Sequence, residues 1–446
     1  MISYSIIQKS QLEGTSRLDA EYYQPEYFIN FSNRDWRPIG DFLKSCQYGL
    51  SQAMNDEKIG YPMFKMDDIK YAFLFKDEVR YANIPEKIFN NFRLERNDVL
   101  FNRVNSEEFV GRTGIFKIDL KSTFASYLIR LQTKDNAEII PDYLNIFLNA
   151  KYGIKQIKKF SRRAVNQANV NAEELKEIKI FVPSVIFQKE IEKISNESWK
   201  NFELAKDFYS QAEKLLLEEL GLADFKEKNE LFNIVNLSDV KSVQRMDAEY
   251  FQTKYDKLLI TLRRYKAKPL EDIIQNVPAR FIPKSDRNYC YVELANINSS
   301  IGMIDGFSEV LGKDAPSRAK RILKNGDVIV SSVEGSLEKV AIADKDQEGY
   351  LASTGFFQFR SKEILPEVMC VLAKSLVFQM QLEKQCAGTI LTAVSKESIK
   401  NILVPVLPKT TQQEIADLVK KSHEARKKAK ELLEEAKKKV ENLIEK

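Results

Sequence analysis

The most regular hydrophobic pattern in the chain is a heptad repeat close to its C-terminus. Between about Thr411 and Glu445 there is no Pro or Gly, and small or apolar residues recur in alternating steps of three and four. This spacing places them on one stripe of an α-helix and is typical of a coiled-coil seam. The residues of this predicted seam are Ile415, Leu418, Ser422, Ala425, Ala429, Leu432 and Ala436.

The same pattern occurs 224 residues earlier. From about Phe187 to Leu222 there is no Pro, and Gly221 is a typical C-terminal stop. Because the two seams share one register, we predict two long helices that pair antiparallel as a coiled coil. The alternative is that each helix packs separately on its own domain. The earlier seam is Ile191, Ile194, Ser198, Asn201, Ala205, Phe208 and Ala212.

The helices belong to a duplication that covers most of the chain. Residues 17–24 read RLDAEYYQ, and residues 245–252, 228 positions later, read RMDAEYFQ. We call these segments the RxDAEY motifs. A fixed spacing of this kind is typical of an internal structural repeat. Further matches follow in the same order, with NDVLF at 97–101 against GDVIV at 326–330, and FAS at 124–126 against LAS at 351–353.

Each repeat predicts an α+β domain. Short apolar runs after polar turns are typical of buried strands, and a Pro at the start of a periodic stretch is typical of a first helical turn. The predicted strands are 98–101, 114–118 and 127–132, then 327–330, 340–343 and 356–360, and the predicted helices are 141–159 and 366–384. We expect two similar, pseudo-symmetric domains at 1–184 and 224–408, each followed by a long helix, at 185–223 and 409–446.

Composition narrows the class of protein. The 43% hydrophobic content supports real cores. No apolar run reaches the roughly 18 residues that span a bilayer, and the N-terminus lacks the features of a secretory signal, so we expect a cytoplasmic protein without a membrane segment. The net charge of +5 permits nucleic-acid binding without demonstrating it.

The motifs of common catalytic and cofactor sites are missing from the sequence. It has no GxGxxG, P-loop or GxSxG segment. Its four cysteines are scattered, which argues against a zinc site or a disulfide framework. The only histidine, His423, lies among lysines, where we expect a solvated residue rather than a base or metal ligand. We therefore expect a chain with no catalytic residues, no cofactor and no metal.

Two further segments complete a recognisable order. After the RxDAEY motif and the DVLF-like strand, the first repeat closes with N-x-N-x-x-x-L-x-x-I-x-I-x-x-P and then Q-x-E-I. These residues are Asn169, Asn171, Leu175, Ile178, Ile180 and Pro183, then Gln188, Glu190 and Ile191. The second set is less complete: Ser395, Ile399, Ile402, Pro405 and Pro408, then Gln412, Glu414 and Ile415.

This order resembles the specificity subunits of type I restriction-modification systems, over nearly the whole chain. The resemblance implies two target recognition domains, each reading one half of a bipartite site in double-stranded DNA. It also implies that the long helices hold these domains apart and dock adenine methyltransferase subunits, which carry S-adenosylmethionine. Nuclease-translocase subunits are further partners in such complexes. One departure is Thr253, where the first repeat has Pro25, so we expect the helix after the second RxDAEY motif to start differently.

The RxDAEY motif itself has a structural interpretation. Asp19 or Asp247 can cap a helix, while the aromatic residues that follow fill a core. Structural residues of this kind are retained on a shared fold while the binding sites on that fold differ.

Candidate DNA contacts lie in three groups of polar residues. The first is the basic stretch at the end of the helix predicted at 141–159, which suits phosphates and, through Arg162 or Arg163, guanine edges. An ordinary solvated basic face is the alternative, but the cations are not balanced by acids in the sequence. The group comprises Lys155, Lys158, Lys159, Arg162, Arg163 and Asn166, with Thr389 and Thr392 in the matching loop.

The second and third groups of candidate DNA contacts lie in segments before or after the predicted strands. Amides and Arg suit adenine and guanine edges, and Glu accepts from cytosine, so the differing chemistry of the repeats indicates different half-sites. The second group comprises Asn102, Arg103, Asn105 and Arg112, with Ser332, Glu334, Ser336 and Lys339 as counterparts. The third comprises Tyr48, Ser51 and Lys65, with Arg280, Lys284 and Arg287.

Two other classes of function remain open. One is an adaptor that assembles a partner protein through its coiled coil without binding DNA. The other is a nuclease with an unrecognised site of Asp, Glu and Lys side chains.

Overall fold

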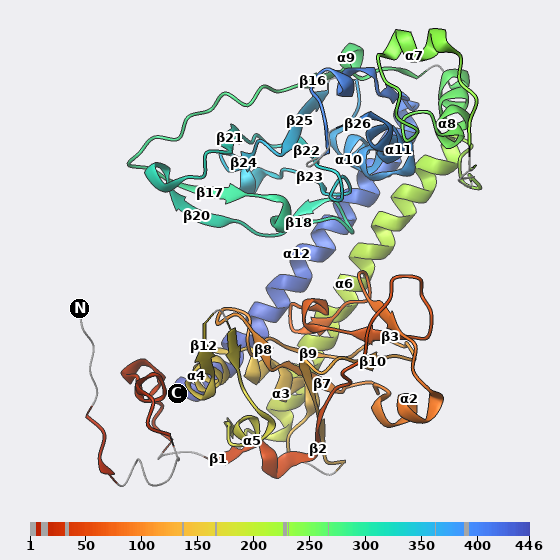
Figure 1. Ribbon diagram of the computed structural model, residues 1–446. Coiled ribbons are helices and arrows are strands. Elements are labelled where there is room, and N and C mark those ends of the chain that lie inside the picture. The colour runs from red at the N-terminus through yellow and green to blue at the C-terminus, as the bar shows by residue number, and fades with distance from the viewer. Residues whose placement is uncertain are drawn as a thin grey trace. The chain divides into compact units, whose positions relative to one another are not determined.

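The computed structural model describes residues 6–9, 17–31, 35–135, 138–165, 167–225, 230, 232–265, 267–361, 363–387 and 392–446 (Figure 1). The chain divides into two compact units, which we call unit 1 (Met1–Phe202 with Lys427–Lys446) and unit 2 (Glu203–Arg426). Each unit includes part of both long helices, which contribute to its core.

Unit 1 is built on a mixed six-stranded sheet in the order β2-β11-β7-β9-β5-β4. Its strands are β2 Leu43–Tyr48, β4 Ile69–Lys70, β5 Phe73–Leu74, β7 Val99–Asn102, β9 Thr113–Ile115 and β11 Leu128–Thr133. Three smaller sheets have the strand orders β10-β3-β6, β12-β13-β8 and β1-β14. Their strands are β1 Trp36–Pro38, β3 Tyr61–Phe64, β6 Arg80–Ala82, β8 Val104–Asn105, β10 Thr123–Phe124, β12 Arg162–Ala164, β13 Gln167–Asn169 and β14 Lys179–Phe181. The helices are α2 Glu86–Phe92, α3 Pro141–Leu148, α4 Lys151–Phe160 and α5 Ala172–Lys176.

Unit 2 repeats the six-stranded sheet in the matching order β16-β25-β22-β23-β19-β18. Its strands are β16 Ile274–Asn276, β18 Ile297–Asn298, β19 Met303–Ile304, β22 Val328–Ser331, β23 Val340–Ile342 and β25 Phe356–Ser361. The smaller sheets have the strand orders β20-β17-β24-β21, β15-β28 and β26-β27. Their strands are β15 Lys268–Pro269, β17 Asn288–Val292, β20 Ser308–Leu311, β21 Ala319–Ile322, β24 Leu351–Ser353, β26 Cys386–Ala387, β27 Ala393–Val394 and β28 Leu403–Val404. The helices are α7 Leu237–Val243, α8 Thr253–Arg264, α9 Leu270–Ile273, α10 Pro366–Lys374 and α11 Leu376–Gln385.

The predicted α+β repeat is therefore confirmed, with two differences in its helices. Each helix predicted at 141–159 and 366–384 is two helices, broken after Leu148 in unit 1 and at Ser375 in unit 2. At the breaks the Asn149 side chain donates to Asn145 O at 2.9 Å, and Ser375 Oγ donates to Leu372 O at 2.7 Å. Such side-chain bonds compete with the helical backbone.

The predicted departure between Pro25 and Thr253 is also present. In unit 1 the short 3-10 helix η2 (Pro25–Tyr27) follows the RxDAEY motif, whereas in unit 2 Thr253 opens α8. Among the described residues, no helix is long and apolar enough to cross a membrane.

The Asp of the NDVLF and GDVIV segments is a buried acceptor in both units. Asp98 and Asp327 are 4% and 1% exposed. A buried carboxylate needs several donors, so each site must keep them. The Arg and Gln that serve the two carboxylates have exchanged places along the matching strands. The donors are Arg130 at 3.5 Å and Gln132 at 2.7 Å for Asp98, and Gln358 at 2.6 Å and Arg360 at 2.8 Å for Asp327.

The antiparallel pairing of the long helices is confirmed within each unit. In unit 1 Ser198 Oγ donates to Ala429 O at 2.8 Å, and in unit 2 Ser422 Oγ donates to Ala205 O at 2.5 Å. Within unit 1, Lys439 also pairs with Glu190 at 2.7 Å, so the residue numbers fall on the second long helix as they rise on the first, as an antiparallel register requires. The helices are α6 Val185–Glu219 and α12 Lys409–Glu445.

Part of the predicted seam is displaced by one residue. Asn201 and Phe208 are only half-buried, while the neighbouring Phe202 and Tyr209 are buried. On α12, Val419 is buried in the place predicted for Leu418. The reason is that each half-helix packs on its own globular core as well as on the other helix, so the buried stripe is wider than an a/d seam. The small seam residues Ser198, Ala205, Ala212, Ser422, Ala429 and Ala436 are all fully buried.

The ends of α6 are fixed by specific contacts. Leu222 N donates to Leu217 O at 2.8 Å, and Gly221, with φ at +67°, donates to Glu218 O at 3.0 Å. This is the Schellman arrangement, which confirms Gly221 as the stop. At the start of α6, Gln188 Oε1 accepts from Ile140 N at 2.9 Å. The corresponding contact of α12, from Leu365 N to Gln412 Oε1, measures 3.0 Å.

The expectation that His423 is solvated is wrong. Its Nε2 lies 2.9 Å from Ile301 O in unit 2, and burial lowers the pKa of the imidazole. The covering loop is more than a hundred residues away in sequence, so no local pattern around His423 indicated it.

We predict that the seam does not tolerate a larger side chain. Replacing Ala436 with Leu adds three carbons at a fully buried position of unit 1 and should cost about 1–3 kcal/mol of unfolding free energy. The matched control is Lys438→Leu on the exposed side of α12, which should stay within about 0.5 kcal/mol. Chemical denaturation of the full chain measures both, and an equal loss for the two variants would contradict this account of the seam.

Candidate nucleic-acid interface

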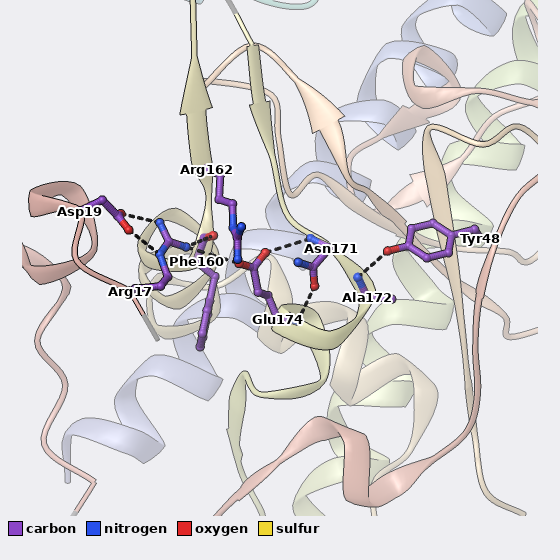
Figure 2. A network of polar contacts seen from close by, with 8 residues as sticks. All are labelled: Arg17, Asp19, Tyr48, Phe160, Arg162, Asn171, Ala172 and Glu174. Atoms are coloured by element: carbon purple, nitrogen blue, oxygen red, sulfur yellow. Dashed lines mark hydrogen bonds and ion pairs between the residues drawn. The ribbon is translucent and has the colours of Figure 1, made fainter. Parts of the chain in front are cut away.

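The RxDAEY motifs hold the chain at the end of α4 in unit 1 and at the start of β26 in unit 2. Arg17 donates to both carboxylate oxygens of Asp19, at 2.8 and 2.5 Å, and its Nη1 donates at 2.8 Å to the carbonyl of Phe160, the last residue of α4 (Figure 2). These bonds hold the pKa of the Asp19 carboxyl below its ordinary value. In unit 2 Arg245 forms the same fork with Asp247, at 2.8 and 2.7 Å, and donates to Cys386 O at 2.9 Å.

The structural interpretation of the motif holds, with one change. Asp247 Oδ1 accepts from Tyr250 N at 3.1 Å, whereas Asp19 makes no side-chain cap. Tyr22 is buried, as predicted, whereas Tyr250 is half-buried.

The basic stretch after α4 forms a hairpin rather than an irregular loop. Strand β13 lies between β12 and β8 and pairs with both. Arg163 lies opposite Ala168, and Ala168 lies opposite Asn105, so Arg163 and Asn105 point to the same side of this small sheet. Arg162 lies opposite Asn169 and therefore points to the other side.

Both arginines of the hairpin have carboxylate partners. Arg162 Nε lies 2.7 Å from Glu174, a residue that also forms the capping box of α5 with Asn171 (Figure 2). Arg163 Nη2 lies 2.8 Å from Glu107 and donates to the Tyr27 hydroxyl at 2.8 Å. The premise that acids do not balance these cations is therefore wrong, because the acids come from segments distant in sequence.

The lysines of this group differ in their surroundings. Lys158 Nζ donates to Glu107 O, and Lys159 lies 4.5 Å from the centre of the Tyr22 ring. Burial lowers the pKa of both ammonium groups. Lys155 is half-buried, and within the described part of the chain its ammonium has no ion pair.

Tyr48 and Arg103, predicted in separate groups, lie together. The Arg103 guanidinium is 4.9 Å from the centre of the Tyr48 ring, and its Nε donates to Ser126 O at 2.9 Å. The Tyr48 hydroxyl accepts from Ala172 N at 2.9 Å, which fixes the ring while 41% of the residue stays exposed (Figure 2). This arrangement holds a guanidinium edge ready for a base or a phosphate.

Asn102 is a correction to the candidate set. It is fully buried, and its Nδ2 donates to Phe109 O at 3.1 Å, so it shapes the turn and is not available to DNA. Asn105 Oδ1 accepts from Ser106 N at 2.8 Å, and the exposed Arg112 stacks on the Phe109 ring at 3.9 Å.

Two candidates of the third group lie on surface loops of unit 1. Ser51 is exposed, and Lys65 lies 3.4 Å from Asp67.

In unit 2 the structure brings Glu334 and Thr392 together. Glu334 N donates to Thr392 O at 3.0 Å, and the Glu334 side chain is exposed. Two serine candidates bond backbone carbonyls: Ser336 Oγ donates within the turn to Val333 O at 3.0 Å, and Ser332 Oγ donates to Gly355 O, between β24 and β25, at 2.9 Å. The remaining described candidates are the half-buried Lys339, 4.0 Å from Glu338, and the exposed Arg280, Lys284 and Arg287. Asn166 and Thr389 lie outside the described residues.

The sequence interpretation missed Glu107, Glu174 and Tyr27. One signal was available: Asn171 and Glu174 have the spacing of a capping box, which places Glu174 at the start of a helix. Nothing local pairs Glu107 with Arg163, because that contact depends on how β8 meets β13.

Comparison with known proteins identifies the family. The family model described as the type I restriction modification DNA specificity domain matches twice, at residues 33–212 and 264–438. This chain belongs to that family. Each match covers most of one predicted repeat and part of its long helix, and the specificity chain is therefore a subunit of type I restriction-modification systems that recognises a DNA target.

The chain is similar to individual proteins as well. The chain is 24% identical over 449 residues to the type I restriction enzyme MjaX specificity subunit of Methanocaldococcus jannaschii, covering 95% of this chain and 97% of the relative. It is 25% identical over 172 residues to the EcoKI specificity subunit of Escherichia coli, covering 38% of this chain and 36% of that one. The crystal structure of the S subunit from M. genitalium aligns with a TM-score of 0.39 at 13% identity, covering 94% of this chain and 97% of that one.

We predict that the hairpin arginines of the specificity chain contact phosphates. Replacing Arg162 and Arg163 together with Ala should weaken DNA binding by the assembled complex. The slope of log affinity against log salt should also fall, by about one for each phosphate that is no longer neutralised. Glu107→Gln is the matched variant of opposite sign. It removes an exposed anion beside Arg163 and should strengthen binding. Titrations at several salt concentrations measure both effects, and an unchanged slope in the double variant would place this hairpin away from DNA.

Proposed function

We propose that the chain recognises an asymmetric bipartite site in double-stranded DNA, with one target recognition domain for each half. The observation that supports this best is that the same framework strand is followed by different chemistry in the two units. Asn102 N donates to Arg112 O at 2.9 Å after β7, and Ser331 N donates to Lys339 O at 3.0 Å after β22, so the two turns are equivalent.

The side chains on these equivalent turns differ in charge. Arg103 follows β7, and Ser332 takes the corresponding place after β22. Asn105 corresponds in the same way to Glu334. Arg favours guanine and Asn favours adenine, whereas Glu accepts from cytosine. Two such turns cannot share one base preference, which supports unlike half-sites.

We further propose that the chain supplies recognition while its partners supply chemistry. Adenine methyltransferase subunits that carry S-adenosylmethionine dock on it, and nuclease-translocase subunits join the same complex. In this proposal residues 1–184 and 224–408 are the recognition domains, and the long helices connect them. The competing function is an adaptor that never meets DNA, and it predicts an assembled complex without DNA affinity.

The first expected outcome concerns methyl transfer. The purified chain should transfer no methyl group to DNA, whereas addition of the methyltransferase subunit encoded with it should produce sequence-specific adenine methylation. Incorporation of labelled methyl groups from S-adenosylmethionine measures this. Robust transfer by the chain alone would overturn the division of labour.

The second expected outcome concerns modularity. Replacing residues 224–408 with the same domain of a relative should change one half of the methylated motif and leave the other half intact. Genome-wide methylation mapping of cells that carry the hybrid measures this, and the reciprocal exchange of residues 1–184 is its control. If one exchange altered both halves, the independent reading of half-sites would be wrong.

A further inference from the structure

One carboxylate oxygen of unit 1 is shared by two arginines. Glu174 Oε1 lies 2.7 Å from Nε of Arg162, on the hairpin, and 3.5 Å from Nη1 of Arg17, in the RxDAEY motif (Figure 2). The other oxygen, Oε2, accepts from Asn171 N at 3.1 Å. The Glu174 side chain therefore links the RxDAEY motif, the hairpin and the start of α5.

The Glu174 carboxylate is held in place, whereas its nearer partner is not. Its Oε2 belongs to the capping box of α5, in which Glu174 N also donates to Asn171 Oδ1 at 2.8 Å. The next residue, Ala172, donates to the Tyr48 hydroxyl, so a shift of α5 would displace Tyr48 as well. The Arg162 side chain, in contrast, is 63% exposed. If Arg162 turns toward a phosphate, it must therefore separate from Glu174.

A carboxylate that loses Arg162 needs another cation. Only 11% of the Glu174 side chain is exposed, and a shielded anion without a partner is costly. Arg17 is already held beside it, by the Phe160 carbonyl at 2.8 Å and by Asp19. The 3.5 Å between Arg17 and Glu174 is at the outer limit of a hydrogen bond, so this contact can strengthen when the nearer one breaks.

Unit 2 keeps the Arg–Asp fork without the shared carboxylate. At the spacing of the long helices, 224 residues, Glu174 corresponds to Ser398. Ser398 N donates to Ser395 Oγ at 3.0 Å, so this turn is also capped, but by a hydroxyl without charge. Among the described residues, Asp247 is the only carboxylate that pairs with Arg245. The second repeat therefore has the motif but not its link to a carboxylate of the closing segment.

We propose that Arg17 and Glu174 are positioning residues for DNA binding by unit 1, which control the release of Arg162 to a phosphate. The inference rests on the proposed function and deepens it by naming residues that act on a DNA contact without touching DNA. In the free chain Glu174 holds Arg162 against the unit. When DNA binds, Arg162 pairs with a phosphate and Arg17 moves closer to Glu174 Oε1. Arg17 thus favours DNA binding through Glu174.

The experiment is a double-mutant cycle on the full chain in complex with the methyltransferase subunit encoded with it. A duplex that carries the methylated motif is titrated at several salt concentrations. Arg17→Gln should weaken binding about two- to fivefold, because Arg162 then stays with Glu174. The slope of log affinity against log salt should also fall, by up to about one.

Glu174→Gln is the second variant of the cycle. It keeps the capping box, in which Gln serves as Glu does, and removes the charge that holds Arg162. It should strengthen binding about two- to fivefold. With Gln at this position, adding Arg17→Gln should change neither the affinity nor the slope, because no carboxylate remains for the two arginines to share.

The matched control is Arg245→Gln, which removes the same fork from unit 2 and should leave the salt slope unchanged. A purely structural role of Arg17 does not depend on the charge of Glu174. An equal loss of affinity from Arg17→Gln in both backgrounds would therefore overturn the proposal, as would an equal fall of the slope for Arg17→Gln and Arg245→Gln. An unchanged slope for Arg162→Ala would overturn it as well. These outcomes leave the proposed function intact, whereas a wild-type complex without DNA affinity would overturn the proposed function itself.

Discussion

The close approach of α6 and α12 is the constraint on which each unit depends. Ser198 Oγ reaches the carbonyl of Ala429 in unit 1, and Ser422 Oγ reaches that of Ala205 in unit 2. A side chain can bond the backbone of a neighbouring helix only where small residues keep the two axes close, and the residues at these two contacts are Ala and Ser. The sheets and short helices of each unit then pack on the outer sides of this pair, which widens the buried stripe of both helices.

The duplicated frame shows which parts of the chain are free to change. Each unit keeps a buried Asp at the start of its central strand and an Arg–Asp fork at a helix end. The position that Arg130 occupies in unit 1 is occupied by Gln358 in unit 2, because the carboxylate needs one Arg and one Gln but not in a particular order. Residues on the turns beyond these anchors carry no such requirement. Recognition chemistry can therefore diverge there without cost to the fold.

Periodicity and repetition predicted the fold well, while the site needed contacts between distant segments. The heptad and the internal repeat located the helices, the strands and Gly221. They misplaced Asn201 and Phe208 by one residue, because heptad spacing describes helix pairing and contains no information on a second packing partner. Asn102 resembled a polar contact residue because its type suits adenine, yet burial depends on the turn that closes over it.

Glu174 and Glu107, which pair with Arg162 and Arg163 of the hairpin, affect how DNA affinity would arise. They are compatible with the proposed contact between these arginines and phosphates. A guanidinium that leaves Glu174 or Glu107 for a phosphate exchanges one ion pair for another, so the gain is a difference between two pairings. Neither exchange leaves a buried charge without a partner. Glu174 keeps its bonds to Asn171 N and to Arg17, and Glu107 is exposed to water. The enthalpy of each exchange is therefore small, and the release of condensed counterions from DNA supplies the driving force. In the proposed function, base discrimination is left to side chains such as Arg103, whose guanidinium is held by Ser126 O and the Tyr48 ring.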